Sequence, residues 1–131
     1  TNVIVRFLVE TPETIEKKFS GVFPFFSKIE KGDIQVRLLP LVLFQVFFVL
    51  PSYYNVPTAL AAEKLIDLIS FKGIIMDDKT AIRQCLKTLE TRNIDLVDAY
   101  LAAYAQHKHI KGIYSFDNDL SKLGISVLKA K

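Results

Sequence analysis

Two aspartates in the segment SFDNDLSKLGI, residues 115–125, combine a side-chain type and a position that suggest chemistry. Asp117 and Asp119 follow an apolar run, where the chain is expected to leave a strand. Carboxylate oxygens at such a point suit a hard divalent cation such as Mg²⁺ or Mn²⁺. The alternative is structural, because an aspartate between a strand and a helix often caps the helix. The residues alone leave both readings open and favour the cap.

A third acid lies in the segment IDLVDAYLAAYA, residues 94–105. Helical periodicity of about 100° per residue predicts one apolar stripe on this segment, formed by Val97, Tyr100, Leu101 and Tyr104. Asp98 lies on the shoulder of the stripe beside small alanines, where it has room to point into a cleft, whereas Asp95 points to solvent. The alternative is a capping pair, with Asp95 as the N-cap and Asp98 favouring the helix dipole.

Composition excludes several other classes of site. Cys85 is the only cysteine, so no internal disulfide can form and a cytoplasmic location is expected. Its position among apolar helical residues predicts a small core residue, not a nucleophile. One cysteine and two histidines without paired spacing do not make a zinc motif. The longest apolar run, residues 38–50, is shorter than the roughly 20 residues needed to span a membrane, so no membrane association is expected.

The chain is expected to fold as one domain over residues 1–131, because its length can supply a single core. Periodicity predicts helices over residues 13–31, 40–50, 57–69, 79–91 and 95–106. Short strands are predicted over residues 34–38, 73–76, 112–116 and 125–128, with a helical turn over 117–123. This alternation predicts an α/β fold with a mainly parallel sheet. Ligands collect at the carboxyl ends of such strands, where Asp117 is placed.

Four segments, in order, resemble the PIN domain family: TNVIVRFLVETPE, LVLFQVFFVL, DLVDAYLAAYA and YSFDNDLSKLGI. The similarity is closest to bacterial PIN proteins such as the toxins of VapBC-type toxin–antitoxin pairs. This resemblance implies a three-layer α/β/α sandwich with a mainly parallel central sheet. It also implies a metal-dependent nuclease that acts on RNA with Mg or Mn, and a protein partner similar to an antitoxin.

The resemblance also assigns site residues. Asp98 and Asp117 match the family's late acids and are the expected catalytic residues and metal ligands. Asp119 is a further metal-ligand candidate with a weaker claim. Ser115 matches a position where the family commonly has Thr or Ser, and it is expected to support the site.

The chain departs from the family at two positions. The family's first acid directly precedes the Thr-Asn that is here Thr1 and Asn2, so the acid and the strand leading to it are expected to be missing. Asn2 is kept as a supporting residue. Gln45 stands where the family usually has Glu, and an amide keeps the shape but loses the charge. With two of four acids left, the activity expected from the family is in doubt.

Residues 3–9 have two readings. The family register makes them a helix, which is the preferred reading. Their β-branched residues would also suit a strand, with Glu10 at its carboxyl end in place of the missing acid.

Three functions therefore compete. The first is a PIN-type ribonuclease, and the second is a degenerate PIN module that binds RNA or a protein without cutting. The third is an interaction protein whose excess aromatic residues form a homodimer interface or receive an amphipathic helix of a partner, the alternative being that all of them belong to the core. These residues are Phe23, Phe25, Phe26, Phe44, Phe47, Phe48, Tyr53 and Tyr54.

Overall fold

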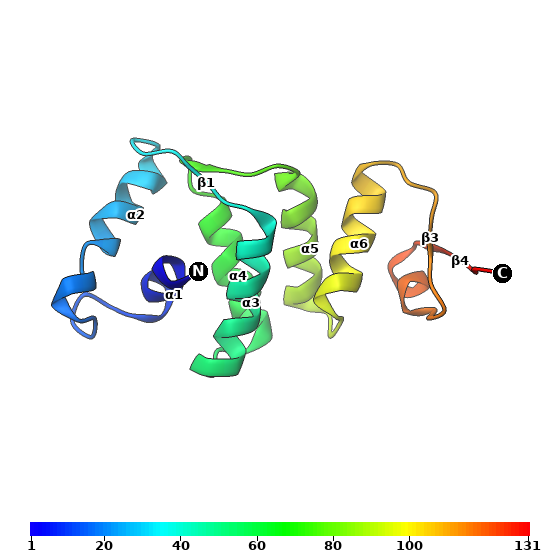
Figure 1. The fold of residues 1–131 in the computed structure, drawn as a ribbon, viewed down its shortest axis with the longest axis horizontal. Coiled ribbons are helices and arrows are strands. Elements are labelled where there is room, and N and C mark those ends of the chain that lie inside the picture. Colours follow the sequence, from blue (N-terminus) through cyan, green and yellow to red (C-terminus); the bar gives the residue numbers. More distant parts are fainter. The chain divides into compact units, whose positions relative to one another are not determined.

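The computed structural model describes all residues from 1 to 131, in two compact units. The first unit, Thr1–Asp77, contains α1 (Asn2–Val9), η1 (Lys17–Phe19), α2 (Val22–Lys31), β1 (Val36–Arg37), α3 (Pro40–Tyr54), α4 (Thr58–Ile69) and β2 (Ile74–Ile75). The second unit, Asp78–Lys131, contains α5 (Lys79–Thr91), α6 (Leu96–His107), β3 (Gly112–Tyr114), η2 (Asp119–Leu123) and β4 (Ser126–Leu128) (Figure 1).

Each unit contains one parallel pair of short strands. β1 pairs with β2 with Val36 opposite Ile74, and β3 pairs with β4 with Gly112 opposite Ser126. All four predicted strands are therefore present, and the α/β class with parallel pairing is confirmed. The strands form two separate two-stranded sheets, so the three-layer sandwich remains an expectation.

The core of the first unit is built from large aliphatic side chains. Those with almost no exposed surface are Ile29, Leu43, Val46, Leu50, Leu65, Leu68 and Ile69. α3 packs against α4 and carries no charged residue, as its apolar sequence predicts. The helix was expected to end near Leu50, but it continues through Pro51 to Tyr54. Asn55, in the left-handed conformation at φ 54°, then ends it.

The helix expected over residues 13–31 is shorter than predicted. Its regular part, α2, begins at Val22, and a 3-10 turn at Lys17–Phe19 precedes it. Pro24 explains the late start, because a proline ring clashes with the carbonyl four residues earlier in a helix and therefore belongs in the first turn. The end at Gly32 is as expected, with the glycine in the left-handed region at φ 87°.

Residues 3–9 are helical, so the preferred reading of this segment is confirmed. α1 buries Val5 and places the Phe7 ring 4.2 Å from that of Phe26 in a stacked pair. This stack fixes α1 against α2 within the first unit.

α5 and α6 lie side by side in the second unit (Figure 1). The buried face of α6 consists of Leu96 and small residues: Ala99, Ala102, Ala103 and Ala105. The predicted stripe of Val97, Tyr100, Leu101 and Tyr104 is wrong, because Val97 is 55 % exposed and the other three are half-buried. The alanine face packs because small side chains bring two helices close together, while the larger residues lie at the margin.

A small apolar cluster positions the segment after β3. It joins Ala102 and Ala105 of α6 to Leu120 of η2 and to Ile125. η2 is thereby held against α6, and the aspartates on both elements are brought into one region. No helix of the protein is both long enough and apolar enough to cross a membrane.

Candidate active site

Some of the expected site residues belong to the first unit and the others to the second. Asn2 and Gln45 belong to the first unit, whereas Asp98, Ser115, Asp117 and Asp119 belong to the second. Within the second unit, Asp98 lies in the first turn of α6, Ser115 and Asp117 lie in the loop between β3 and η2, and Asp119 is the first residue of η2.

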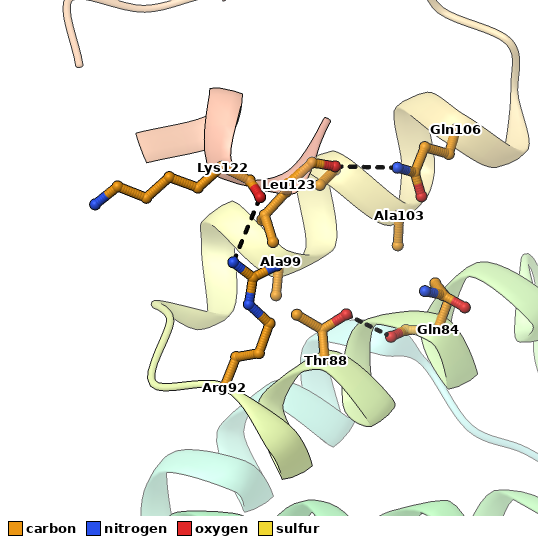
Figure 2. A pocket seen from close by; sticks show the side chains of 9 residues that line it. Gln84, Thr88, Arg92, Ala99, Ala103, Gln106, Lys122 and Leu123 are labelled. Atoms are coloured by element: carbon orange, nitrogen blue, oxygen red, sulfur yellow. Dashed lines mark hydrogen bonds between the residues drawn. The ribbon is translucent and has the colours of Figure 1, made fainter. Parts of the chain in front are cut away.

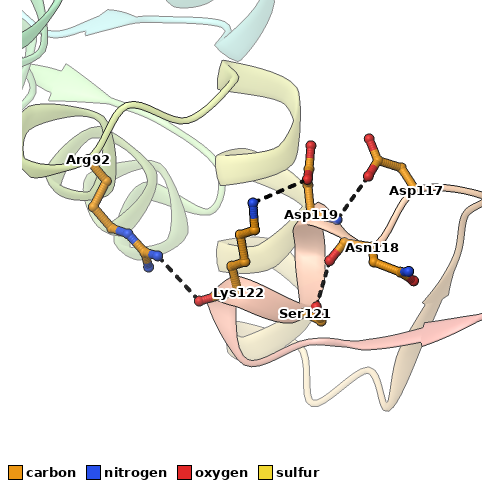
Figure 3. Close-up of polar contacts among 6 residues, drawn as sticks. All are labelled: Arg92, Asp117, Asn118, Asp119, Ser121 and Lys122. Atoms are coloured by element: carbon orange, nitrogen blue, oxygen red, sulfur yellow. Dashed lines mark hydrogen bonds and ion pairs between the residues drawn. The ribbon is translucent and has the colours of Figure 1, made fainter.

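Two consecutive side-chain turns shape the loop after β3. The Ser115 hydroxyl accepts a hydrogen bond from the Asp117 amide at 3.0 Å. Asp117 Oδ1 then accepts one from the Asp119 amide, also at 3.0 Å (Figure 3). Such short-range bonds set the backbone direction where Ser and Asp precede a helix. One carboxylate oxygen of Asp117 therefore sets the backbone direction at the start of η2, and the other oxygen can bind a further ligand.

A lysine from the end of the chain braces this loop. Lys129 donates from Nζ to the Ser115 carbonyl and to Asn118 Oδ1, each at 3.2 Å. The bonds tie the segment after β4 to the loop after β3, so the carboxyl ends of the two strands support the same turn.

The start of α6 carries two acids with different roles. Asp95 is the N-cap, and its carboxylate accepts a hydrogen bond from the Val97 amide at 3.1 Å. Asp98 lies in the first turn and is half-buried. The capping role is therefore confirmed for Asp95, and the Asp98 carboxylate is not used in that cap.

The electrostatic environment of Asp98 is unfavourable for its negative charge. Partial burial raises the pKa of its carboxyl above the ordinary aspartate value, and the nearby carboxylates of Asp95, Asp119 and Asp117 raise it further. Like charges that share a site make ionisation harder, and a bound cation relieves that repulsion. The four acids thus form one electrostatic group, although they come from two separate elements.

A cavity of about 260 Å³ lies at this acidic group. Asp95, Asp98 and Asp119 line it together with Arg92 and Lys122. The Lys122 ammonium lies 3.6 Å from Asp119 Oδ1 (Figure 3). Asp119, the weaker candidate from the sequence, thus shares a cavity with Asp98, whereas Asp117 is not among the lining residues.

The acidic side chains at this site are of the type that binds a hard cation, but they are few. All the acidic ligands are carboxylate oxygens, which Mg²⁺ and Mn²⁺ prefer. No group of three or more His, Cys, Asp or Glu side chains has the geometry of a metal site. Mg²⁺ commonly uses one or two carboxylates and keeps several waters, so the residues fit a weakly held ion.

The first unit has uncharged amide side chains at its two expected positions. Gln45 is exposed on α3, and its Oε1 accepts a hydrogen bond from the Thr1 hydroxyl. Asn2 is the first residue of α1 and is also exposed. The Gln45 side chain reaches the surface, so it is not an amide buried within the apolar helix.

Two cations at the site were not singled out from the sequence. Arg92 follows the end of α5, and Lys122 lies three residues after Asp119 in η2. The second spacing carried a signal, because residues three apart are neighbours on a helical turn. Arg92 gave no signal, since only the packing of η2 brings it to the cavity.

Comparison with known proteins gives one family match. A family model described as PIN domain matches residues 1–125 of the 131-residue chain. No curated protein and no solved structure matched. PIN domains have an α/β fold, bind RNA and are generally metal-dependent nucleases. Because the match covers nearly the whole chain, the protein belongs to the PIN domain family.

Proposed function

We propose that this protein is a metal-dependent endoribonuclease of PIN type, and that its chemistry takes place at the acids of the second unit. One observation carries the proposal: Asp98 of α6 and Asp119 of η2 line one cavity, where burial and then the nearby carboxylates of Asp95, Asp119 and Asp117 raise the pKa of Asp98. A carboxyl group whose pKa is shifted by burial and by neighbouring charges inside a cavity is a candidate for a functional site. The carboxyl end of a parallel strand pair is also where α/β folds place ligands.

The residues present suggest a division of roles. Asp98 and Asp117 are the proposed metal ligands, and Asp119 stays a further candidate with a weaker claim. A bound Mg²⁺ or Mn²⁺ lowers the pKa of its water and neutralises charge that develops on a phosphodiester. Ser115 orients Asp117 through the amide hydrogen bond, and Arg92 and Lys122 supply positive charge beside the cavity.

The test compares Asp98→Asn, Asp117→Asn and Asp119→Asn with the unchanged protein. Calorimetric titration with Mn²⁺ measures binding, and gel analysis of single-stranded RNA with Mn²⁺ measures cleavage. We expect Asp98→Asn to abolish detectable Mn²⁺ binding and to lower cleavage about 100-fold or more. Asp33→Asn, an exposed acid of the first unit, is the matched control and should change neither. Unchanged cleavage in Asp98→Asn would refute the assignment.

A second candidate function is a partner-binding module without nuclease activity. α3 favours it, because large apolar side chains remain exposed on this helix: Leu41, Phe48, Tyr53 and Tyr54. A cavity of about 500 Å³ lies on this surface and is lined by Leu41, Val42, Phe44, Gln45, Phe48, Val49 and Tyr53. Exposed apolar patches often mark protein interaction sites. The resemblance to toxins of VapBC-type pairs suggests an apolar helix of an antitoxin-like protein as the partner, and a homodimer is the other option.

Charge insertion on α3 separates these outcomes. Leu41 is 79 % exposed, so Leu41→Lys should leave the fold intact. In sedimentation, a dimer that uses this surface should dissociate in the variant while Mn²⁺ binding is retained. A monomer at micromolar concentration in both proteins would remove the homodimer and leave the antitoxin-like partner.

A further inference from the structure

A second cavity lies beside the acidic one, within the second unit. It has a volume of about 240 Å³ and is formed by α5, α6 and the end of η2 (Figure 2). Its lining residues are Gln84, Thr88, Arg92, Ala99, Ala102, Ala103, Gln106, Lys122 and Leu123. The alanines of α6 leave the space open, and the polar side chains surround it.

Existing hydrogen bonds use only part of this polar lining. Arg92 Nη2 donates to the Lys122 carbonyl at 3.4 Å, and Gln106 Nε2 donates to the Leu123 carbonyl at 3.2 Å (Figure 2). The guanidinium group has five N–H donors, and an amide also offers its oxygen and a second N–H. Gln84 on α5 is exposed and also lines the cavity. The cavity therefore presents a cation, several donors and several acceptors to a ligand.

Arg92 and Lys122 connect the two cavities, since both residues line each of them. A chain of phosphates that runs from the acids into the second cavity would pass these two cations. Arginine is well suited to phosphate because its planar fork matches the oxygens. No aromatic side chain lines the second cavity, so a base would be held there through hydrogen bonds at its edge, without stacking on an aromatic ring.

We propose that the cavity between α5, α6 and η2 binds one nucleotide of single-stranded RNA adjacent to the phosphodiester at Asp98. Arg92 contacts the phosphate of this nucleotide, and Gln84, Thr88 and Gln106 contact its base. This inference rests on the proposed nuclease function, because it takes Asp98 as the place of the scissile bond. It adds a subsite that positions the RNA strand and gives it direction.

The choice of variants must separate binding from structural support. Arg92 and Gln106 also fasten η2 through its carbonyls, so changing them would disturb the fold and the ligand together. Gln84→Glu leaves these bonds intact and adds one negative charge to the cavity wall. Thr88→Met fills part of the cavity without a change of charge. Lys87→Gln is the matched control, because it changes the charge of α5 by the same amount at an exposed residue outside the lining.

The experiment measures RNA binding by the full chain without cleavage. A labelled single-stranded RNA of about eight nucleotides is titrated in EDTA and followed by fluorescence anisotropy. We expect Gln84→Glu and Thr88→Met each to weaken binding about tenfold, a loss of the size expected for base-edge contacts, and Lys87→Gln to weaken it less than about twofold. Side-chain amide signals of Gln84 and Gln106 should shift in NMR spectra on adding the RNA. Equal affinity of wild type, Gln84→Glu and Thr88→Met would overturn the proposal.

Failure of the subsite and failure of the nuclease function give different results. RNA binding that depends on Gln84 and Thr88, with no cleavage after Mn²⁺ is added, would keep the subsite and reject the nuclease. Cleavage with Mn²⁺ that is unaffected by Gln84→Glu and Thr88→Met would keep the nuclease and reject the subsite. Thermal melting of each variant checks that the second unit is folded. Because Gln84 is exposed, Gln84→Glu still tests the subsite if Thr88→Met unfolds.

Discussion

α3 in the first unit and α6 in the second differ in the size of the side chains that they bury and in the charge that they carry. α3 has no charged residue, and large side chains cover both its buried and its exposed faces. α6 turns alanines inward and carries Asp95 and Asp98 at its start. An uncharged helix offers no anionic ligand to a cation, whereas the first turn of α6 presents carboxylates beside a cavity. The proposed cation site therefore belongs to the second unit, whereas α3 of the first unit exposes an apolar surface.

The size of the buried side chains on each helix determines how much free space remains beside it. Leu43, Val46 and Leu50 of α3 are fully buried, so this face leaves little free space. The alanines of α6 fill less volume, and cavities remain where η2 crosses the helix. Small residues on α6 thus bring the acids of two elements together and leave room for a ligand between them.

The largest expected difference between the units is in the stability that each loses when a tightly packed glycine is changed to alanine. Gly73 precedes β2, where an added Cβ would lie 2.7 Å from the Ile29 carbonyl oxygen and would also collide with the Ile34 carbonyl. Backbone atoms on both sides cannot give way, so Gly73→Ala should destabilise the first unit by about 3 kcal/mol or more. Urea unfolding followed by circular dichroism measures the loss.

Two further glycines provide the comparison. At Gly112 of β3, a Cβ would meet Leu128 Cγ at 3.0 Å and the Ser126 carbonyl at 3.1 Å, and the leucine can move. Gly112→Ala should therefore cost about 1 kcal/mol. Nothing lies within 4 Å of a Cβ at Gly21, so Gly21→Ala should change stability by less than about 0.5 kcal/mol. A loss for Gly112→Ala that equals or exceeds the loss for Gly73→Ala would contradict the tighter packing of the first unit.

The next largest effect on stability is expected at the N-terminal caps of α6 and α3. Asp95 caps α6 with its side chain, and Asp95→Ala should lower the free energy of unfolding by about 1 kcal/mol. α3 starts at Leu39 and Pro40 without a side-chain cap. Leu39→Ser supplies one at an exposed position and should raise the same free energy by about 0.5 kcal/mol. Chemical denaturation of both variants checks the opposite signs, and equal signs would show that capping does not govern these two helices.

The sequence predicted the elements better than it predicted their faces. α5 was predicted at its observed bounds, because Ile82, Leu86 and Leu89 recur at helical spacing and are all buried. The buried face of α6 was predicted wrongly, because bulky residues dominate a periodicity argument while alanine decides how closely two helices pack. Pro24 shows the same limit, since it delays the start of a helix that periodicity alone would begin at residue 13.

The candidate site was predictable in its residue types and not in its arrangement. Asp98, Asp117 and Asp119 were identified from the segments that carry them. Which oxygen of Asp117 is used in the turn, and which acid shares the cavity with Asp98, depends on the packing of η2. Arg92 and Lys122 enter the site only through that packing, so no short motif could reveal both.

The smallest expected effect tests whether the acids of the second unit act as one group. Since Asp119 raises the pKa of Asp98, Asp119→Asn should lower this pKa towards the ordinary aspartate value. The change is measured by titrating the side-chain carboxyl signal of Asp98 in NMR spectra. Asp33→Asn, in the first unit, is the control and should leave the titration of Asp98 unchanged.

The raised pKa also fixes the sign of the pH dependence. The folded protein holds the Asp98 proton more tightly than the unfolded chain does, so this group favours folding at low pH and the benefit is lost as pH rises through its folded pKa. Cation binding requires the ionised form, so Mn²⁺ affinity should fall as pH is lowered through the same pKa. In Asp119→Asn this fall should begin at a lower pH, even if the overall affinity is weaker. An unchanged midpoint would mean that Asp119 does not influence the ionisation of Asp98, and the electrostatic coupling between η2 and α6 would be refuted.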